Sequence, residues 1–387
     1  MKLKSIPEDF QVEELAEPQL GGGPFALYCL TKTSLGTPEA IQAICQAWRL
    51  PRDAVAVGGL KDRHAVTRQF LSIENGPRRK LGQTNFELEY LGQTARPFDS
   101  KDILANRFAI VLRDLGPSDV DDVASALPQA AEAGVPNYFD DQRFGSVGVS
   151  GDFIARPWCL GDYDRALWLA LAESNTHDRP AVRDEKESLR AHWGDWPACR
   201  RSATRPVTRA ALERLCHVPH DFRGAFVRIP QHERRLYLEA FQSFLWNRVL
   251  AESIRALFDA AELFDVEIAR TPVPFYRVTP PPAVCETLAR PLPLPSARER
   301  SELGPLSDLY ERVAGEFGLE CRTLRVKYPR DSFFSRGARP AIFRPQSLCW
   351  EPGDDELEPG RRKLLLRFDL PPGCYATVLV KRIAGTP

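Results

Sequence analysis

The sequence has 387 residues, of which 43% are hydrophobic and 27% are charged, and its formal net charge is zero. This length and composition predict a globular protein of two or three domains with a sizeable core. No run of about eighteen apolar residues occurs, which excludes a helical membrane span. The N-terminus also lacks the apolar core of an export signal. We therefore expect a cytoplasmic protein with no membrane partner.

Nine cysteines are scattered along the chain without a Cys-x-x-Cys pair. The nearest metal-like grouping, Cys216-His217 with His220, lacks a fourth ligand at the usual spacing. Neither a dinucleotide-binding nor a P-loop signature is present. The sequence predicts reduced thiols, no metal site and no cofactor.

Positive charge is concentrated in two stretches. Arginines outnumber acids between Arg190 and Arg235, and Asp331 is the only acid between Arg322 and Arg344. Because salt confines the field of each patch to roughly 10 Å, a neutral protein can still bind phosphates through a local basic face. Surface ion pairs explain the same excess of arginine, and the sequence leaves both interpretations open.

The N-terminal part of the chain predicts two strands and a helix. Residues 3–14 contain a proline turn that leads into an alternating Phe10-x-Val12 strand, and residues 24–31 form a second apolar strand. Thr37 is expected to cap the helix that follows, with Pro38 at its first position.

Four consecutive polar residues, Lys61 to His64, separate two short strands predicted over residues 54–57 and 65–73. Two fixed cations beside Asp62 favour its ionised form, which suits a nucleophile or a base rather than an acid. A loop between rigid strands can hold such a group still and accessible. A solvated hairpin tip without chemical function is the alternative.

Three further features lie between residues 100 and 150. A buried strand is predicted over 106–113, and Ser118 is expected to cap the next helix with Asp121 in a capping box. In the run from 134 to 145, the Asn137 amide can pair with a base edge and the Phe139 ring can stack on a base. A turn held by asparagine between two buried aromatic residues is the alternative.

From about Ser150 the sequence becomes rich in helical patterns. We predict helices beginning near Gly161 and over 235–250 and 308–317, with a basic strand over 322–328. Near the C-terminus, residues 363–370 and 375–382 predict two paired strands joined by a Pro-Pro-Gly turn.

Several of these runs resemble the signatures of the TruD family of tRNA pseudouridine synthases, in matching order. The runs are residues 4–14, 59–69, 105–108, 134–145, 241–247, 336–340 and 371–377. The chain departs from the family pattern at Ala105 and Asp140, where glycine is usual. Aspartate tolerates the left-handed backbone that such a glycine suggests.

The resemblance implies a role for six residues. Asp62 matches the catalytic aspartate, and Lys4 matches a lysine near the active site. The aromatic residues matching Phe10 and Tyr375 contact the target nucleotide, Asn137 binds substrate and positions the aspartate loop, and Phe139 lines the pocket.

The activity implied is isomerisation of a uridine in RNA, usually uridine-13 in the D arm of tRNA, to pseudouridine. The base must first leave its stack, which costs a few kcal/mol and requires aromatic and amide contacts. Asp62 either attacks C1′ or removes a ribose proton, and the sequence does not choose between these. Alternatives are a non-catalytic RNA-binding or chaperone protein on the same scaffold, and a glycoside hydrolase, which needs a second positioned carboxylate.

The resemblance also implies the architecture. It predicts an α+β fold, with a pseudouridine-synthase-like mixed, mainly antiparallel sheet flanked by helices and an inserted α/β TRUD domain. Residues 1–150 and 337–387 are expected to form the catalytic domain and residues 151–336 the insertion. The expected partner is tRNA, with other RNA open, and a monomer is expected.

Overall fold

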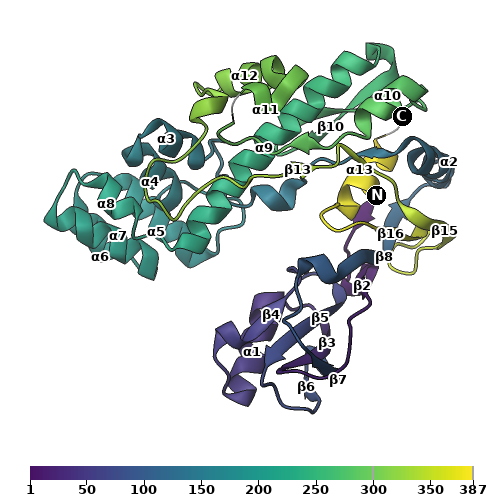
Figure 1. Ribbon diagram of the computed structural model, residues 1–387, viewed down its shortest axis with the longest axis horizontal. Coiled ribbons are helices and arrows are strands. Elements are labelled where there is room, and N and C mark those ends of the chain that lie inside the picture. Colours follow the sequence, from purple (N-terminus) through teal and green to yellow (C-terminus); the bar gives the residue numbers. More distant parts are fainter. Residues whose placement is uncertain (299, 386–387) are drawn as a thin grey trace. The chain divides into compact units, whose positions relative to one another are not determined.

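The computed structural model describes residues 1–298 and 300–385. The chain folds into two compact units (Figure 1). Unit 1 comprises Met1–Val135 and the C-terminal stretch from Phe343, and unit 2 comprises Pro136–Ile342. The two short strands β9 (Val135–Pro136) and β14 (Ile342–Phe343) lie where the chain passes from one unit to the other. The crossings therefore fall at other residues than the expected 150 and 337.

Unit 1 is built on a ten-stranded sheet with the order β15-β16-β8-β2-β5-β3-β7-β6, and β1 and β4 pair with β8 and β5. Among these strands β2 and β5 run parallel, and the other pairs are antiparallel. The strands are β1 (Lys2–Leu3), β2 (Phe10–Ala16), β3 (Phe25–Thr33), β4 (Val55–Val57), β5 (Val66–Glu74), β6 (Leu81–Gln83), β7 (Phe86–Thr94), β8 (Ile103–Leu115), β15 (Gln346–Asp354) and β16 (Arg362–Leu370). The mixed, mainly antiparallel sheet confirms the predicted α+β class.

One core of unit 1 lies between β3 and helix α1 (Thr37–Trp48). Side chains alternate across a strand, so Tyr28 and Leu30 point to the same face of β3 and meet Ile41 and Ile44 of the helix. This face of the sheet continues into β5. The helix therefore covers the strands that lead into and out of the predicted catalytic loop.

Both predicted helix caps were wrong by one or two residues. Helix α1 is capped by Gly36, because the hydroxyl of Thr37 bonds to other parts of the fold. Helix α2 (Pro117–Ala133) is capped by Gly116, whose N–H donates to the Asp119 carboxylate at 2.7 Å. In each case a proline in the first turn sets the start of the helix.

The predicted strand over residues 375–382 was also wrong. Residues 376–382 belong to helix α13 (Ala376–Ala384), which Tyr375 caps and which lies against α2. A short run rich in valine and threonine cannot be assigned to strand or helix by composition alone. Burial on α2 decides it here, since Leu379, Arg382 and Ile383 are buried at helical spacing. The first predicted strand of the pair is present as β16, which lies between β15 and β8.

Unit 2 is rich in helices and contains two small antiparallel strand pairs. Its helices are α3 (Ala155–Leu160), α4 (Tyr163–Leu171), α5 (Pro180–Ala191), α6 (Trp196–Ser202), α7 (Pro206–His217), α8 (Phe222–Phe226), α9 (Gln231–Leu257), α10 (Pro282–Leu288), α11 (Arg300–Leu303) and α12 (Ser307–Gly315). Its strands are β10 (Leu263–Ile268), β11 (Thr271–Tyr276), β12 (Leu292–Pro293) and β13 (Ala338–Arg339). The predicted helices over 235–250 and 308–317 are confirmed as α9 and α12.

The basic strand predicted over 322–328 is absent from the described structure. A short 3-10 turn, Cys321–Thr323, occupies its beginning, and no strand follows before residue 338. The proline at 329 cannot donate to a sheet, and the arginines on either side are exposed. Leu324 is buried and Val326 and Tyr328 are half-buried, so the segment has an inward side, but no strand among the described residues pairs with it.

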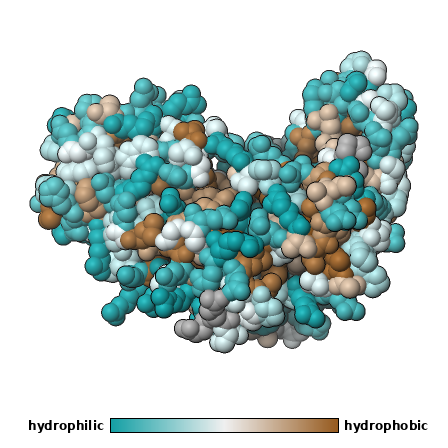
Figure 2. All heavy atoms as spheres, turned by 90° about the horizontal axis from the view of Figure 1, so that it is seen from above, coloured by the Kyte–Doolittle hydropathy of each residue, from teal (hydrophilic) through white to brown (hydrophobic). Residues whose placement is uncertain are grey.

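No helix in the described part of the chain is both long and apolar enough to cross a membrane. The face drawn in Figure 2 is mostly hydrophilic, with apolar residues in smaller patches. None of the nine cysteines forms a disulfide.

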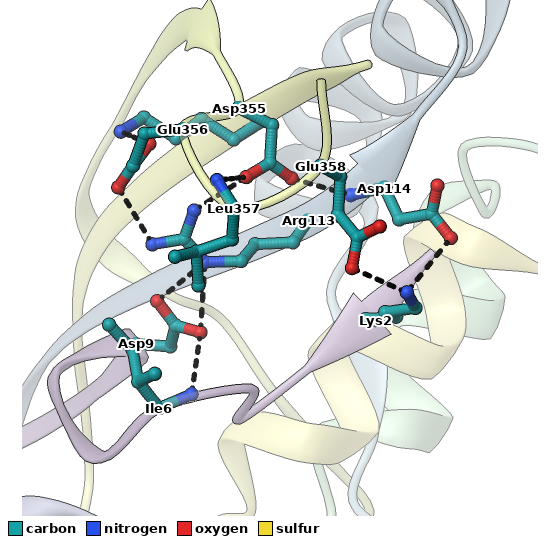
Figure 3. A network of polar contacts seen from close by, with 10 residues as sticks. Lys2, Ile6, Asp9, Arg113, Asp114, Asp355, Glu356, Leu357 and Glu358 are labelled. Carbon is teal, nitrogen blue, oxygen red and sulfur yellow. Dashed lines mark hydrogen bonds and ion pairs between the residues drawn. The ribbon is translucent and has the colours of Figure 1, made fainter. Parts of the chain in front are cut away.

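A buried arginine joins the N-terminal segment to the sheet and to the β15–β16 connection (Figure 3). Arg113 on β8 is 2% exposed, and its guanidinium donates to Asp9 at 2.9 Å, Asp355 at 2.7 Å and Glu356 at 3.0 Å. Asp9 in turn accepts from the backbone N–H of Ile6 at 3.1 Å. This network fixes the turn immediately before Phe10.

The electrostatics of the network follow from these contacts. The hydrogen bond from Arg113 holds the pKa of Glu356 down to about 2. Burial opposes ionisation of Asp355, but its hydrogen bonds from backbone N–H groups and from Arg113 keep its pKa below the ordinary value.

Replacing Arg113 by methionine should strongly destabilise unit 1. Two buried carboxylates, Asp9 and Asp355, would lose their cation, and breaking a buried pair in this way typically costs about 3–5 kcal/mol. The free energy of opening can be measured by hydrogen exchange at the amides of β8. In the control variant Arg68→Met, which breaks an exposed ion pair with Glu13, we expect a loss below about 1 kcal/mol. Equal losses in the two variants would contradict the prediction.

Candidate active site

The structure brings three of the predicted site residues together. Asp62 lies in the loop of residues 58–65 between β4 and β5, which we call the Asp62 loop. Its Oδ2 atom is 2.6 Å from the Lys4 ammonium, and the Lys4 Nζ atom lies 3.9 Å from the centre of the Phe10 ring. The Asp62 side chain is 29% exposed, so a fixed cation adjoins a carboxylate that solvent can still reach.

The backbone at Lys4 is unusual. Its φ angle is +60°, in the left-handed region that costs a residue with a β-carbon about 1–2 kcal/mol. The turn that follows is held by Asp9 and Arg113, as described above. In this strained backbone conformation the Lys4 side chain extends toward Asp62 and Phe10.

The Phe10 ring is 3% exposed and meets Phe108 edge to face, with ring centres 6.1 Å apart. Phe108 stacks on Phe368 of β16 at 5.4 Å. The predicted nucleotide contact is therefore one end of a row of aromatic rings that crosses the neighbouring strands β2, β8 and β16.

Buried side chains satisfy the backbone of the Asp62 loop. The Thr37 hydroxyl accepts from the Lys61 N–H at 3.0 Å and donates to the Gln69 amide oxygen at 2.7 Å. The Gln69 amide nitrogen donates to the Gly59 carbonyl at 3.2 Å. An irregular loop cannot pair its own N–H and carbonyl groups, so these contacts replace the backbone hydrogen bonds that a neighbouring strand would provide.

A buried lysine supports the same loop. Lys32 on β3 is 0% exposed, and its ammonium donates to the carbonyls of Leu35 at 2.7 Å and Asp62 at 2.9 Å, with a longer contact to Lys61 at 3.5 Å.

The Lys61 side chain points into the sheet. Its ammonium lies 2.8 Å from the Glu14 carboxylate and donates to the Asn106 side chain at 2.8 Å. Arg63 and His64, by contrast, are exposed, and Arg63 pairs with Glu39. The polar run of the loop thus divides into residues that anchor it and residues that face solvent.

Gly58 permits a close approach between the loop and the connection that precedes β8. A β-carbon at this position would lie 2.7 Å from Ile103 and 3.0 Å from Phe98. Nearby, Leu60 is 69% exposed. There is thus no room for a β-carbon at Gly58. Separately, the apolar side chain of Leu60 is exposed to solvent near Asp62.

Tyr375 lies in unit 1, at the position that caps helix α13, and is half-buried. Its carbonyl accepts from the Val378 N–H at 3.1 Å. The change from predicted strand to helix therefore places this residue at a helix N-terminus.

Asn137 and Phe139 lie in unit 2 and are buried. The Asn137 amide donates to the Pro340 carbonyl at 3.1 Å, and its oxygen accepts from the Arg339 guanidinium at 2.7 Å. That guanidinium also lies 4.0 Å from the centre of the Phe139 ring. Asn137 and Phe139 therefore both contact the guanidinium of Arg339.

Helix α9 fixes the same segment. The Asn247 side chain accepts from the Phe139 N–H at 2.9 Å and donates to the Phe139 carbonyl at 2.8 Å. Phe139 also meets Trp246 edge to face at 5.5 Å. Three runs singled out in the sequence, 134–145, 241–247 and 336–340, therefore meet inside unit 2.

Asp140, which replaces the usual glycine, does not adopt the left-handed backbone allowed for it. Its φ and ψ angles are −94° and 172°, which is extended backbone that any residue can adopt. The side chain is 3% exposed. The substitution therefore causes no backbone strain.

Sequence reasoning missed Lys32, Thr37, Gln69 and Arg339. A signal existed for two of them, because Lys32 is in phase with the core residues Tyr28 and Leu30 and Gln69 is in phase with Leu71. A polar residue at a core-facing position of a strand requires a buried partner. Thr37 carried no such signal, since its position suits an ordinary helix cap.

Within the described residues no group of three or more His, Cys, Asp or Glu side chains could hold a metal ion.

The chain is similar to proteins of one family. It matches the family model described as tRNA pseudouridine synthase D (TruD) over residues 1–273. It is 28% identical over 405 residues to "Probable tRNA pseudouridine synthase D 1" of Methanococcus maripaludis, covering 99% of both chains. It is 26% identical over 415 residues to tRNA pseudouridine synthase D of Aquifex aeolicus, covering 99% of this chain and 98% of that one.

A solved structure shares the fold. The crystal structure assigned to tRNA pseudouridine synthase D (TruD) of Methanosarcina mazei matches with a TM-score of 0.72 at 23% identity. The match covers 99% of this chain and 93% of that one.

Replacing Thr37 by valine should loosen the Asp62 loop. The variant keeps the shape but leaves the Lys61 N–H and the buried Gln69 amide without their partner, at a cost of about 1–3 kcal/mol. Urea unfolding and hydrogen exchange over residues 58–65 would measure the loss. Thr67→Val is a matched control, because the buried Thr67 hydroxyl has no hydrogen-bond partner in the structure, and we expect little or no loss there. Wild-type exchange in Thr37→Val would refute the anchoring role.

Proposed function

The chain belongs to the TruD family of tRNA pseudouridine synthases, and we propose that it converts uridine-13 in the D arm of tRNA to pseudouridine with Asp62 as the catalytic carboxylate. Enzymes of this family are isomerases that act on tRNA. The observation that carries the proposal is the Asp62 carboxylate, held 2.6 Å from Lys4 and beside Phe10 on a loop with an anchored backbone.

The reaction requires a carboxylate at the sugar. In one route an Asp62 oxygen bonds to C1′ as the C1′–N1 bond breaks and its electron pair leaves with the uracil. In the other, Asp62 removes the C2′ proton as the same bond breaks. In the first route the uracil turns and C5 bonds to C1′ as the bond between C1′ and the Asp62 oxygen breaks, which frees the carboxylate. In the second, C5 bonds to C1′ as Asp62 returns the proton to C2′. In both, the C5 proton is then lost and N1 gains one. No net oxidation occurs, and each route uses a carboxylate, which Asp62 supplies 2.6 Å from Lys4.

Lys4 and Phe10 support this step in different ways. The Lys4 ammonium lies 2.6 Å from the Asp62 carboxylate before substrate arrives, and it can stabilise negative charge that develops on the uracil. We assign Phe10 as an apolar contact for a base that has left its stack. Because the ring is 3% exposed and the Lys4 ammonium lies 3.9 Å from its centre, this contact requires Lys4 to move. We assign Tyr375 as a second aromatic contact to the nucleotide, because it is half-buried in the same unit.

We assign Asn137 and Phe139 to substrate binding from unit 2. The Arg339 guanidinium that both residues contact supplies a cation for a phosphate or a base. In this proposal unit 1 is the catalytic domain and unit 2 is the inserted domain that binds tRNA, through arginines such as those between Arg190 and Arg235. Because the substrate is tRNA, we propose the cytoplasm as the place of action, with the protein working as a monomer.

Asp62→Asn should abolish pseudouridine formation while leaving tRNA binding intact. The amide keeps the shape of the side chain but can neither attack C1′ nor take a proton, so we expect a loss in kcat on the order of 10³-fold or more. Conversion of purified tRNA measures the rate, and a filter-binding assay measures the affinity. Asp53→Asn, which changes an exposed aspartate on the neighbouring turn, should behave as wild type. Near-normal turnover by Asp62→Asn would overturn the assignment.

A tRNA transcript with cytidine at position 13 should not be modified. Cytosine also has a C5 carbon, but it lacks the C4 carbonyl and the N3–H of the uracil edge, and its isomerisation would not give pseudouridine. Pseudouridine mapping of wild-type and U13C transcripts, each incubated with the enzyme, tests the position. Modification of the U13C transcript at another uridine would refute the position and leave the assigned reaction standing.

A further inference from the structure

A lysine lies fully buried beneath the Asp62 loop. Lys32 occupies the core-facing side of β3 with 0% exposure, yet its ammonium lies within ion-pair distance of no carboxylate among the described residues. Its partners are backbone carbonyls, those of Leu35, Asp62 and, at 3.5 Å, Lys61. Two of its three partners thus belong to the proposed catalytic residue and its neighbour.

A buried cation of this kind is costly, because a charge loses its hydration without gaining an opposite charge. An apolar residue of similar length would fill the same space without this penalty. The other buried lysine, Lys186 in unit 2, differs in that both oxygens of the Asp178 carboxylate lie 2.9 Å from its ammonium. Burial alone therefore does not explain why a lysine stands at position 32.

The charged groups around Lys32 can be named. Burial is the main cause that lowers its pKa, to about 8, and the nearby cations Lys61 and Arg63 act in the same direction. Asp62 and Glu39 oppose them. Lys32 is thus charged at neutral pH and loses its proton in the mildly alkaline range.

We propose that Lys32 is a positioning residue for the reaction, whose ammonium clamps the Lys61–Asp62 backbone from the core side and so holds the Asp62 carboxylate toward Lys4 and the sugar. This inference rests on the proposed role of Asp62. Lys32 touches neither substrate nor the reacting atoms, and it acts through the two carbonyls. An ammonium has three N–H donors for three carbonyls, whereas a neutral amine has two and no charge.

The clamp has a pH signature that a purely structural lysine lacks. The turnover of the wild type should fall as pH rises through about 8, because the clamp loses its charge. Folding stability should change in the opposite direction. Between about 8 and the ordinary value of 10.5, the unfolded chain holds a proton that the folded state has released, so Lys32 makes stability rise with pH. Activity lost by unfolding would instead accompany falling stability.

The test compares Lys32→Met with Lys186→Met and Asp62→Asn in the full-length protein. In Lys32→Met we expect kcat at pH 7 to fall about tenfold to hundredfold, as small misplacements of a catalytic group do, with KM for tRNA within about twofold of wild type. The alkaline fall near pH 8 should disappear, and hydrogen exchange over residues 58–65 should accelerate. Lys186→Met should change stability and leave kcat and its pH profile as in wild type.

The possible failures are distinguishable. Wild-type kcat and pH profile in Lys32→Met, with Asp62→Asn inactive, would overturn the clamp and leave the proposed function standing. An active Asp62→Asn would overturn the proposed function and the clamp with it. Should Lys32→Met fail to fold, the wild-type profile decides: a fall in kcat near pH 8 without loss of stability supports the clamp. A level profile, or a fall that accompanies unfolding, contradicts it.

Discussion

The ion pair between Lys4 and Asp62 is the contact on which the candidate site depends, because it joins two segments that are far apart in the sequence. Neither partner is positioned by regular secondary structure. Lys4 has a left-handed backbone between β1 and the turn before β2, and Asp62 lies in an irregular loop. The geometry of the pair therefore has to be imposed from outside, on both sides.

The two sides are fixed by different physical means. On the Lys4 side, Arg113 gathers Asp9 and the β15–β16 connection into one buried charge network, so the position of the N-terminal turn is linked to the last strands of the sheet. On the Asp62 side, the fixing groups are mostly neutral or aimed at backbone. Lys32, Thr37 and Gln69 bond to carbonyl and N–H groups of the loop, not to the Asp62 carboxylate. A carboxylate anchored by its own backbone can change its partner during a reaction without releasing the loop.

Whether an element or residue role could be predicted from the sequence depends on whether the contacts that determine it are local or distant along the chain. Strands β3, β5, β8 and β16 and helices α1 and α9 were predictable from periodicity, because each has a continuous buried face. Asp62, Lys4 and Phe10 were singled out from resemblance and local chemistry. The helix at Ala376–Ala384 was not predictable, since its identity depends on contact with α2. The anchoring role of Thr37 was hidden for a similar reason, as its partners Lys61 and Gln69 lie more than twenty residues away.

Unit 2 shows the same division between a reactive-looking residue and the groups that hold it. Asn137 and Phe139 were expected to face a substrate, yet their polar contacts within the unit already involve Arg339, Pro340 and Asn247. Asn247 binds the backbone of Phe139 at both its N–H and its carbonyl, which is how a strand neighbour would bind it. Helix α9 thus provides the hydrogen bonds that the backbone after β9 would otherwise lack. Thr37 and Gln69 do the same for the Asp62 loop. The resemblance to one family in the runs 134–145, 241–247 and 336–340 has a physical basis here, since side chains of the second and third runs satisfy the backbone of the first.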